Sequence, residues 1–73
     1  MFGWKRTHEA ATVGGVTYDV TELRKAVLDE CYAMALNVSE AALPDAFDAE
    51  NASPTELIRI AREYGVRLSR YEV

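Results

Sequence analysis

The sequence predicts a small single-domain α+β protein: an N-terminal β-hairpin, two main helices with a short helix between them, and a candidate third strand at the C-terminus. Three observations support this prediction: paired glycines between two β-prone runs, an apolar stripe at helical spacing, and a strong helix start near residue 53. The chain has 73 residues, of which 49% are hydrophobic, so residues 1–73 can form one small domain. Residues 1–8 are expected to be a flexible N-terminal stretch.

The hairpin is predicted by Gly14-Gly15, which separates the runs 9–13 and 16–20. Tight primed turns need positive φ angles at both central residues, and glycine adopts these angles without steric cost. The second run alternates apolar and polar side chains, as a half-buried strand does. Because an isolated two-stranded hairpin is only marginally stable, its apolar side must pack on another element.

Two main helices follow from apolar spacing and from their end signals. The first covers residues 21–36; Asp19 with Glu22 fits a capping box at its start, and Thr21 is the competing N-cap. The second begins at Ser53-Pro54, a capping residue followed by a first-turn proline, and ends at Gly65, which suits a left-handed C-terminal cap. The apolar stripe of the first helix consists of Leu23, Val27, Cys31 and Met34, and a second row of Leu28, Tyr32 and Ala35 or Leu36 widens it.

The segments around these helices carry weaker signals. Residues 37–51 are predicted to form a short helix and a loop, with a break or restart at Pro44, which lacks the amide that a helix interior needs. Leu43 and Phe47 are expected to anchor this connection to the core. Residues 66–71 alternate apolar and polar side chains, a pattern that suits a third strand.

The formal net charge of −4 is unevenly distributed along the chain. Residues 26–56 contain seven acidic residues and no basic one, whereas residues 57–73 contain four arginines and two glutamates. One interpretation is that the acidic middle and the basic tail neutralise each other within the domain. The alternative is an acidic surface that binds a basic partner protein. Direct contact of this segment with nucleic acid is disfavoured, because phosphates repel it.

No group of side chains predicts catalysis, a cofactor or a metal site. Cys31 is the only thiol and lies on the apolar stripe, where cysteine behaves as a small hydrophobe. His8 is the only imidazole, and the chain has no Cys/His cluster with zinc-ligand spacing. The acidic run 45–51 lacks the glycine and the regular alternation of a calcium-binding loop. We therefore expect no enzymatic activity.

Composition also bears on the compartment and on association. No run approaches 18 consecutive apolar residues, and the first six residues lead into no apolar segment of the kind found in signal peptides. The single cysteine excludes an internal disulfide, so a cytoplasmic location without membrane contact is expected. A core of this size supplies only about 3–5 kcal/mol, which makes a partner subunit or a homo-oligomer a reasonable expectation.

A short part of the chain resembles the first helix and turn of helix-turn-helix DNA-binding domains. The resemblance covers residues 57–66, in which Ala61 lies four positions before Gly65 and an apolar residue follows. In that family a recognition helix comes next and enters the major groove, whereas only eight residues follow Gly65 here. The resemblance implies a DNA-binding regulator as an alternative function. Its contacts would be Arg59, Arg62, Arg67 and Arg70.

The leading hypothesis is a non-enzymatic protein-binding module: a small regulator, inhibitor or accessory subunit. Its candidate contact residues are Asp45, Asp48 and Glu50 in the acidic middle, together with Trp4, an aromatic residue beside two basic ones. The expected partner is another protein with a basic surface. A third hypothesis is a structural subunit of a larger assembly, with Trp4 and the helix faces as contacts.

Overall fold

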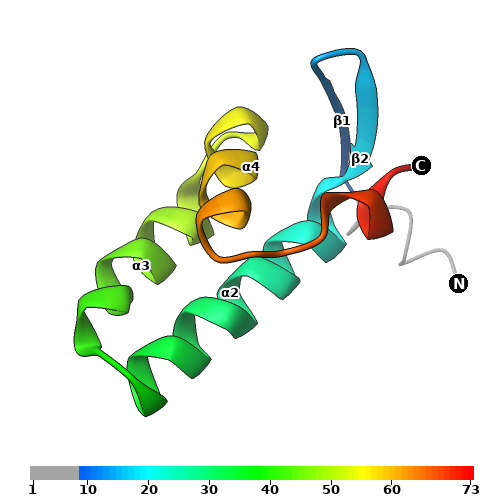
Figure 1. The fold of residues 1–73 in the computed structure, drawn as a ribbon. Helices are drawn as coiled ribbons and strands as arrows, with labels where there is room; N and C mark the ends of the chain where they lie inside the picture. The colour runs from blue at the N-terminus through cyan, green and yellow to red at the C-terminus, as the bar shows by residue number, and fades with distance from the viewer. Residues whose placement is uncertain (1–8) are drawn as a thin grey trace, which may run out of the picture.

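A computed structural model describes residues 9–73 of the chain (Figure 1). The predicted α+β class is confirmed, because an antiparallel hairpin precedes three helices. The expectations for residues 1–8, including those for Trp4 and His8, lie outside the described residues. The elements are β1 (Ala10–Val13), β2 (Val16–Asp19), α2 (Val20–Asn37), the 3-10 helix η1 (Glu40–Ala42), α3 (Leu43–Asn51), α4 (Pro54–Glu63) and the 3-10 helix η2 (Leu68–Tyr71).

The hairpin stands at the N-terminal end of α2 and has the predicted glycine turn (Figure 1). Gly14 and Gly15 have φ angles of 62° and 84°, and both positive values match a primed turn. The hydroxyls of the cross-strand pair Thr12 and Thr17 are 2.7 Å apart. Tyr18 lies on the other side of β2, where it is 7% exposed and joins the core. The apolar side of the hairpin therefore packs on the helices, as its marginal stability requires.

Helix α2 forms where the apolar stripe predicts it, within about one residue at each end. The Asp19 carboxylate accepts a hydrogen bond from the backbone amide of Glu22 at 3.2 Å, which confirms the predicted N-cap. Cys31 is fully buried, so its assignment to the core is confirmed as well. Met34 is 38% exposed, however, because it lines an open hollow among the end of α2, η1, α3 and the end of α4.

Residues 37–51 were predicted to form a short helix followed by a loop. In the structure the second part of this segment is helix α3, which continues to Asn51. The chain makes the 3-10 turn η1 and restarts so that Pro44 lies in the first turn of α3, where its missing amide has no intrahelical partner to lose. Ala46 and Ala49 are fully buried, and their small side chains allow α3 to lie close against α2. The prediction that Phe47 anchors this segment is wrong. Phe47 lies about 100° around the helix from Ala46 and is 56% exposed.

Helix α4 begins and ends as predicted. The Ser53 hydroxyl accepts a hydrogen bond from a first-turn amide at 3.3 Å. At the other end Gly65 has a φ of 74°, and the amide of Val66 donates to the carbonyl of Ala61 at 2.9 Å. This is the hydrogen bond of a Schellman cap, for which glycine is the preferred residue. The cap turns the chain back toward α2 and the hairpin.

The candidate third strand is not formed among the described residues. Leu68–Tyr71 forms η2, and only an isolated bridge between Tyr18 and Glu72 links the C-terminus to the hairpin. In a strand, Leu68 and Tyr71 would point to opposite faces, whereas a 3-10 helix aligns residues three positions apart. The 3-10 geometry therefore lets both half-buried side chains pack against the core.

The core lies where the hairpin and the three helices meet, and the described residues include no buried polar or charged side chain. Of the helices in residues 9–73, none is both long and apolar enough to cross a membrane. The buried cluster consists of Tyr18, Val20, Leu23, Val27, Cys31, Ala46, Ala49, Leu57, Ile58, Ile60 and Ala61.

Candidate functional site

The acidic residues of the middle segment fall into two sets, and the first faces basic residues. Asp29 and Glu30 of α2 line a hollow of about 500 Å³ together with Arg67 and Arg70 from the C-terminal segment. Opposite charges thus share one hollow at this place, in line with the interpretation that the middle and the tail compensate each other. This set contributes little net charge to a contact surface.

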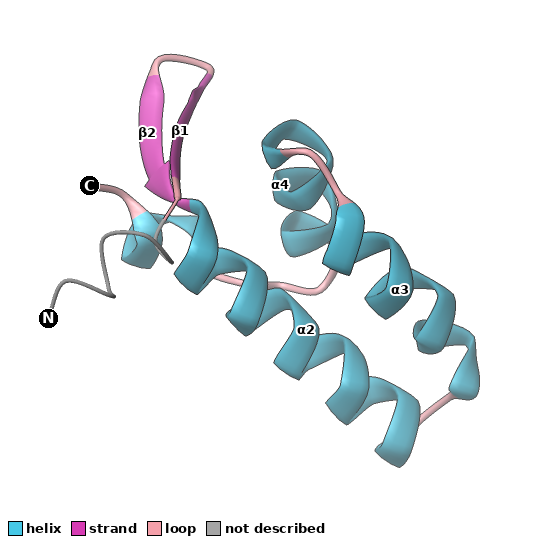
Figure 2. Ribbon diagram, turned by 180° about the vertical axis from the view of Figure 1, so that it is seen from behind, coloured by secondary structure: helices cyan, strands magenta, loops and turns pink. Residues whose placement is uncertain are grey.

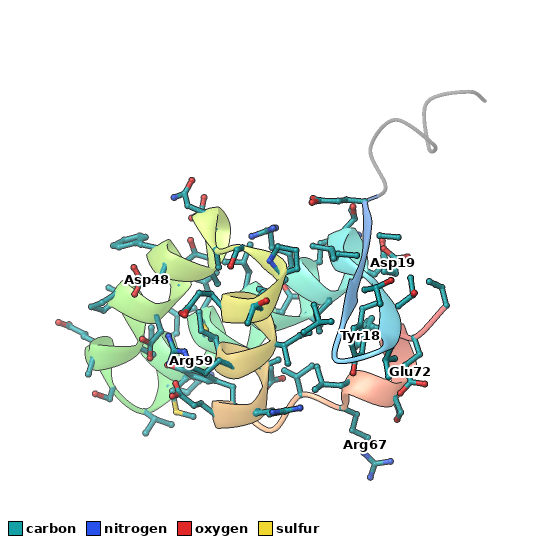
Figure 3. All side chains as sticks on the ribbon, turned by 90° about the horizontal axis from the view of Figure 1, so that it is seen from above. Tyr18, Asp19, Asp48, Arg59, Arg67 and Glu72 are labelled. Carbon is teal, nitrogen blue, oxygen red and sulfur yellow. The ribbon has the colours of Figure 1, made fainter. Side chains whose placement is uncertain are left out.

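The second set has no such compensation. Glu40 of η1 and Asp48 and Glu50 of α3 are exposed, and none forms an ion pair with a lysine or arginine among residues 9–73. Figure 3 shows Asp48 far from Arg67, at the other end of the molecule. We call Glu40, Asp48 and Glu50 the acidic surface. Two of the residues predicted from the sequence, Asp48 and Glu50, are therefore exposed, although they lie on opposite sides of α3 because they flank the buried Ala49 by about 100° each.

Arg59 is the basic residue that borders this surface. It lines a hollow of about 290 Å³ between α3 and α4 together with Asp48. Its guanidinium is already held within α4, at 2.7 Å from Glu56 and 3.1 Å from Glu63. The hydrogen bonds that Arg59 donates to the Glu56 carboxylate raise the pKa of Arg59 above its ordinary value. Arg59 donates its hydrogen bonds to Glu56 and Glu63 of its own helix. It therefore forms no ion pair with Asp48, whose charge can act on a partner.

Asp45, the third predicted contact, has a structural partner. The Tyr64 hydroxyl donates a hydrogen bond of 2.6 Å to its carboxylate, which joins α3 to α4. Asp45 lies on the opposite side of α3 from Phe47, since the two residues flank buried Ala46 by about 100° each. The hydrogen bond to Asp45, with burial as a second cause, raises the pKa of Tyr64 well above its ordinary range.

This hydrogen bond makes the stability of the fold sensitive to alkaline pH. Above about pH 10 an unfolded Tyr64 ionises while the folded one keeps its proton, so the free energy of unfolding falls as the pH rises. Tyr64→Phe is expected to lower this free energy by about 1 kcal/mol at neutral pH and to make its alkaline decline shallower. Urea unfolding at a series of pH values measures both effects. An unchanged alkaline slope in Tyr64→Phe would contradict this assignment.

Glu50 connects the acidic surface to α2. Its carboxylate accepts a hydrogen bond of 3.1 Å from the Tyr32 hydroxyl, and this bond raises the pKa of Tyr32. Asp48 makes no hydrogen bond or ion pair within residues 9–73. Glu50 therefore has a fixed position, while Asp48 is free to turn toward a partner. The prediction for Trp4 is untested, because this residue lies outside the described part of the chain.

Apolar side chains beside this surface are exposed, so the prediction that Tyr32 and Leu36 widen the apolar stripe of α2 toward the core is wrong. Leu36 is 85% exposed and Phe47 56% exposed, and Tyr32 is 36% exposed at the surface of α2. A helical projection of the sequence could have revealed Leu36, which lies about 180° around α2 from Val27 in the predicted stripe. Phe47 could not be placed in this way, because the sequence did not reveal which side of α3 is buried.

The arginines of the DNA-binding alternative do not form a single group. Arg62, Arg67 and Arg70 are exposed, whereas Arg59 is paired within α4. The segment after Gly65 is a 3-10 helix of four residues, shorter than the α-helix that such domains place in the major groove. DNA binding through these residues stays a prediction.

The expectation that the chain has no active site stays a prediction. Burial raises the pKa of the Cys31 thiol, and a protonated thiol is a poor nucleophile. In the described part of the chain, no three His, Cys, Asp or Glu side chains are grouped closely enough to hold a metal ion. Comparison with known proteins finds no matching family model, no matching curated protein and no matching solved structure.

Proposed function

We propose that this chain is a non-enzymatic protein-binding module, a small regulator, inhibitor or accessory subunit, that binds a basic partner protein through its acidic surface. The observation that supports this most is the exposure of Glu40, Asp48 and Glu50 without an ion pair to any base in residues 9–73. The proposed compartment is the cytoplasm, because the lone cysteine can form no internal disulfide.

Unpaired surface charges act on a partner over a longer range than paired ones. Like charges on one surface sum to a field that speeds encounter with an oppositely charged protein and that weakens as salt rises. Asp45 is not part of the proposed contact, because its carboxylate holds Tyr64. Asp29 and Glu30 are excluded too, since they share a hollow with two arginines.

The test compares two double charge reversals with the same change in net charge. In the first, Asp48→Lys and Glu50→Lys reverse the acidic surface; in the second, Asp29→Lys and Glu30→Lys reverse the other acidic set. The tagged chain is incubated with nuclease-treated lysate of its source cells, and its affinity for the protein recovered in stoichiometric amount is measured at several salt concentrations. The first variant is expected to bind at least about tenfold more weakly and with a smaller salt dependence.

The second variant is expected to bind as the unmodified chain does. Equal weakening in both variants would show that total charge, and not the acidic surface, governs binding. Unchanged affinity in the first variant, or recovery of no partner, would contradict the proposal. Circular dichroism of each variant verifies the fold, since Glu50→Lys also removes the acceptor of the Tyr32 hydroxyl.

A further inference from the structure

The pair formed by α2 and α3 exposes apolar side chains on the side opposite the Asp45–Tyr64 hydrogen bond. On α3, Asp45 reaches Tyr64 of α4, and Phe47 lies on the other side of the buried Ala46. On α2, Tyr32 marks the same side, because its hydroxyl reaches across to Glu50 of α3. We call this the outer face; it consists of Tyr32, Leu36, Leu43, Phe47 and Glu50.

Helical geometry places Leu36 on the outer face. Leu36 is four residues after Tyr32, so the two side chains are neighbours one turn apart on α2. Leu43 is four residues before Phe47 and has the same relation to it on α3. Phe47 forms the edge of the outer face, since it also lines the hollow toward α4. Figure 2 shows α2 and α3 side by side along this part of the molecule.

The exposed side chains of the outer face contribute little to the domain itself. Leu36 is 85% exposed and gains little burial from its own chain, and Phe47 leaves more than half of its surface exposed, at 56%. Large apolar side chains that gather on a surface and are bordered by polar groups are typical of interaction sites. The Tyr32/Leu36 pair on α2 and the Leu43/Phe47 pair on α3 form two neighbouring apolar rows, which suits the apolar stripe of an amphipathic helix. The nine residues of α3 span about 14 Å, which corresponds to two to three turns of a bound helix.

We infer that the outer face binds a basic amphipathic helix of the partner protein, an inference that rests on the proposed function and names the part of the partner involved. Apolar side chains of that helix would pack on Leu36 and Phe47. Its lysines or arginines would reach Asp48 and Glu50 at the border of the face. A second copy of this chain fits less well, because it would bring the same carboxylates against one another.

The experiment uses synthetic peptides of about five helical turns. One peptide has leucine at helical spacing and lysine elsewhere; a second has the same composition in scrambled order; a third has glutamate in place of lysine. Each is titrated into the isotope-labelled chain, and amide chemical shifts are recorded. The leucine–lysine helix is expected to bind at least about tenfold more tightly than the scrambled peptide. Its shifts should be confined to α2 and α3, around Tyr32, Leu36 and Phe47.

Variants of exposed residues keep the fold and test the face directly. Leu36→Ser and Phe47→Ser are each expected to weaken binding of the leucine–lysine helix about tenfold. The matched control is Val73→Ser, which replaces another exposed apolar residue, 76% exposed, at the C-terminus beside β2. This control should bind as the unmodified chain does. Loss of affinity in all three variants, or in none, would overturn the inference.

The remaining outcomes separate this inference from the proposed function. The scrambled peptide and the leucine–lysine helix could bind equally tightly, and the Asp48→Lys, Glu50→Lys variant could bind neither peptide. This result would support binding through the acidic surface and would overturn the inference that the outer face binds a helix. If the leucine–glutamate helix binds as tightly as the leucine–lysine helix, the preference for a basic partner fails and both proposals fall. The amide chemical shifts of Leu36 and Phe47 could also change with protein concentration when no peptide is present. This result would overturn the inference, because it would show that the outer face binds a second copy of the chain.

Discussion

Leu23→Ala is expected to remove most of the free energy of unfolding of this domain at 25 °C. Leu23 is fully buried at the contact between α2 and the rest of the core. Truncating a buried leucine costs about 2–5 kcal/mol, because apolar contacts are lost and a cavity remains. A domain of this size has only about 3–5 kcal/mol of net stability, so a single cavity removes most of it. Far-UV circular dichroism during urea unfolding measures the effect.

Leu36→Ala is the matched control, since it makes the same change in the same helix at a side chain that is 85% exposed. It should change the free energy of unfolding by less than about 0.5 kcal/mol. Ile60→Val gives a smaller effect that stays measurable: Ile60 is 2% exposed, and losing one buried methylene costs about 0.5–1.5 kcal/mol. If Leu36→Ala costs as much as Leu23→Ala, Leu36 is buried in solution and the assigned core is wrong.

The elements that could be predicted from the sequence are those whose signals are local. Gly14-Gly15 determines the hairpin turn, and Asp19 and Ser53 determine where two helices begin, because each acts on the backbone within a few residues. Gly65 determines the end of α4 for the same reason. Such signals depend little on the rest of the fold, and all of them are confirmed.

The errors come from segments whose conformation depends on tertiary packing. The sequence pattern of residues 66–71 suits a strand, but the Leu68 and Tyr71 side chains both reach the core only in a 3-10 helix. Phe47 was expected in the core because it is large and apolar. The alanines on its helix face the core instead, since α3 must lie close to α2. Neither choice can be made before the neighbouring elements are placed.

The candidate site shows the same division. The composition of the sequence was enough to indicate an acidic segment, and Asp48 and Glu50 are exposed on it. The sequence could not separate them from Asp45, which faces α4 and binds Tyr64. Nor could it show that Asp29 shares a hollow with Arg67, about forty residues away in the chain. Which acids remain available to a partner is a property of the folded surface alone.

Arg24→Met is expected to lower the free energy of unfolding by about 1.5–3 kcal/mol, the range for hydrogen bonds that involve a charged group. The guanidinium Nη1 of Arg24 donates to the carbonyls of Ala49 at 2.6 Å and Ala52 at 3.1 Å, with Glu50 at 3.4 Å. These carbonyls lie at the end of α3, which has no basic residue in its last turn. Arg24 therefore caps α3 from α2, where its positive charge also meets the negative end of the helix dipole.

Lys25→Met is the control for this prediction, because it removes the same charge and introduces the same side chain at the next position. The Lys25 side chain is 69% exposed, and its nearest acidic partner, Glu22, is 3.8 Å away. Exposed pairs of this kind contribute little, so the control should lose less than about 0.5 kcal/mol. Methionine, lysine and arginine have similar helix propensities, so neither change disturbs α2 itself.

Hydrogen exchange of the amides around Ala49 and Ala52 locates the effect of Arg24→Met. Without the cap these carbonyls lose their donor, and the end of α3 and its connection to α4 should exchange faster than the hairpin does. Equal losses of stability in Arg24→Met and Lys25→Met would mean that the positive charge on α2 matters and the cap does not. A loss confined to Arg24→Met, with faster exchange at the end of α3, would show that one arginine holds α2 and α3 together and thereby maintains the outer face.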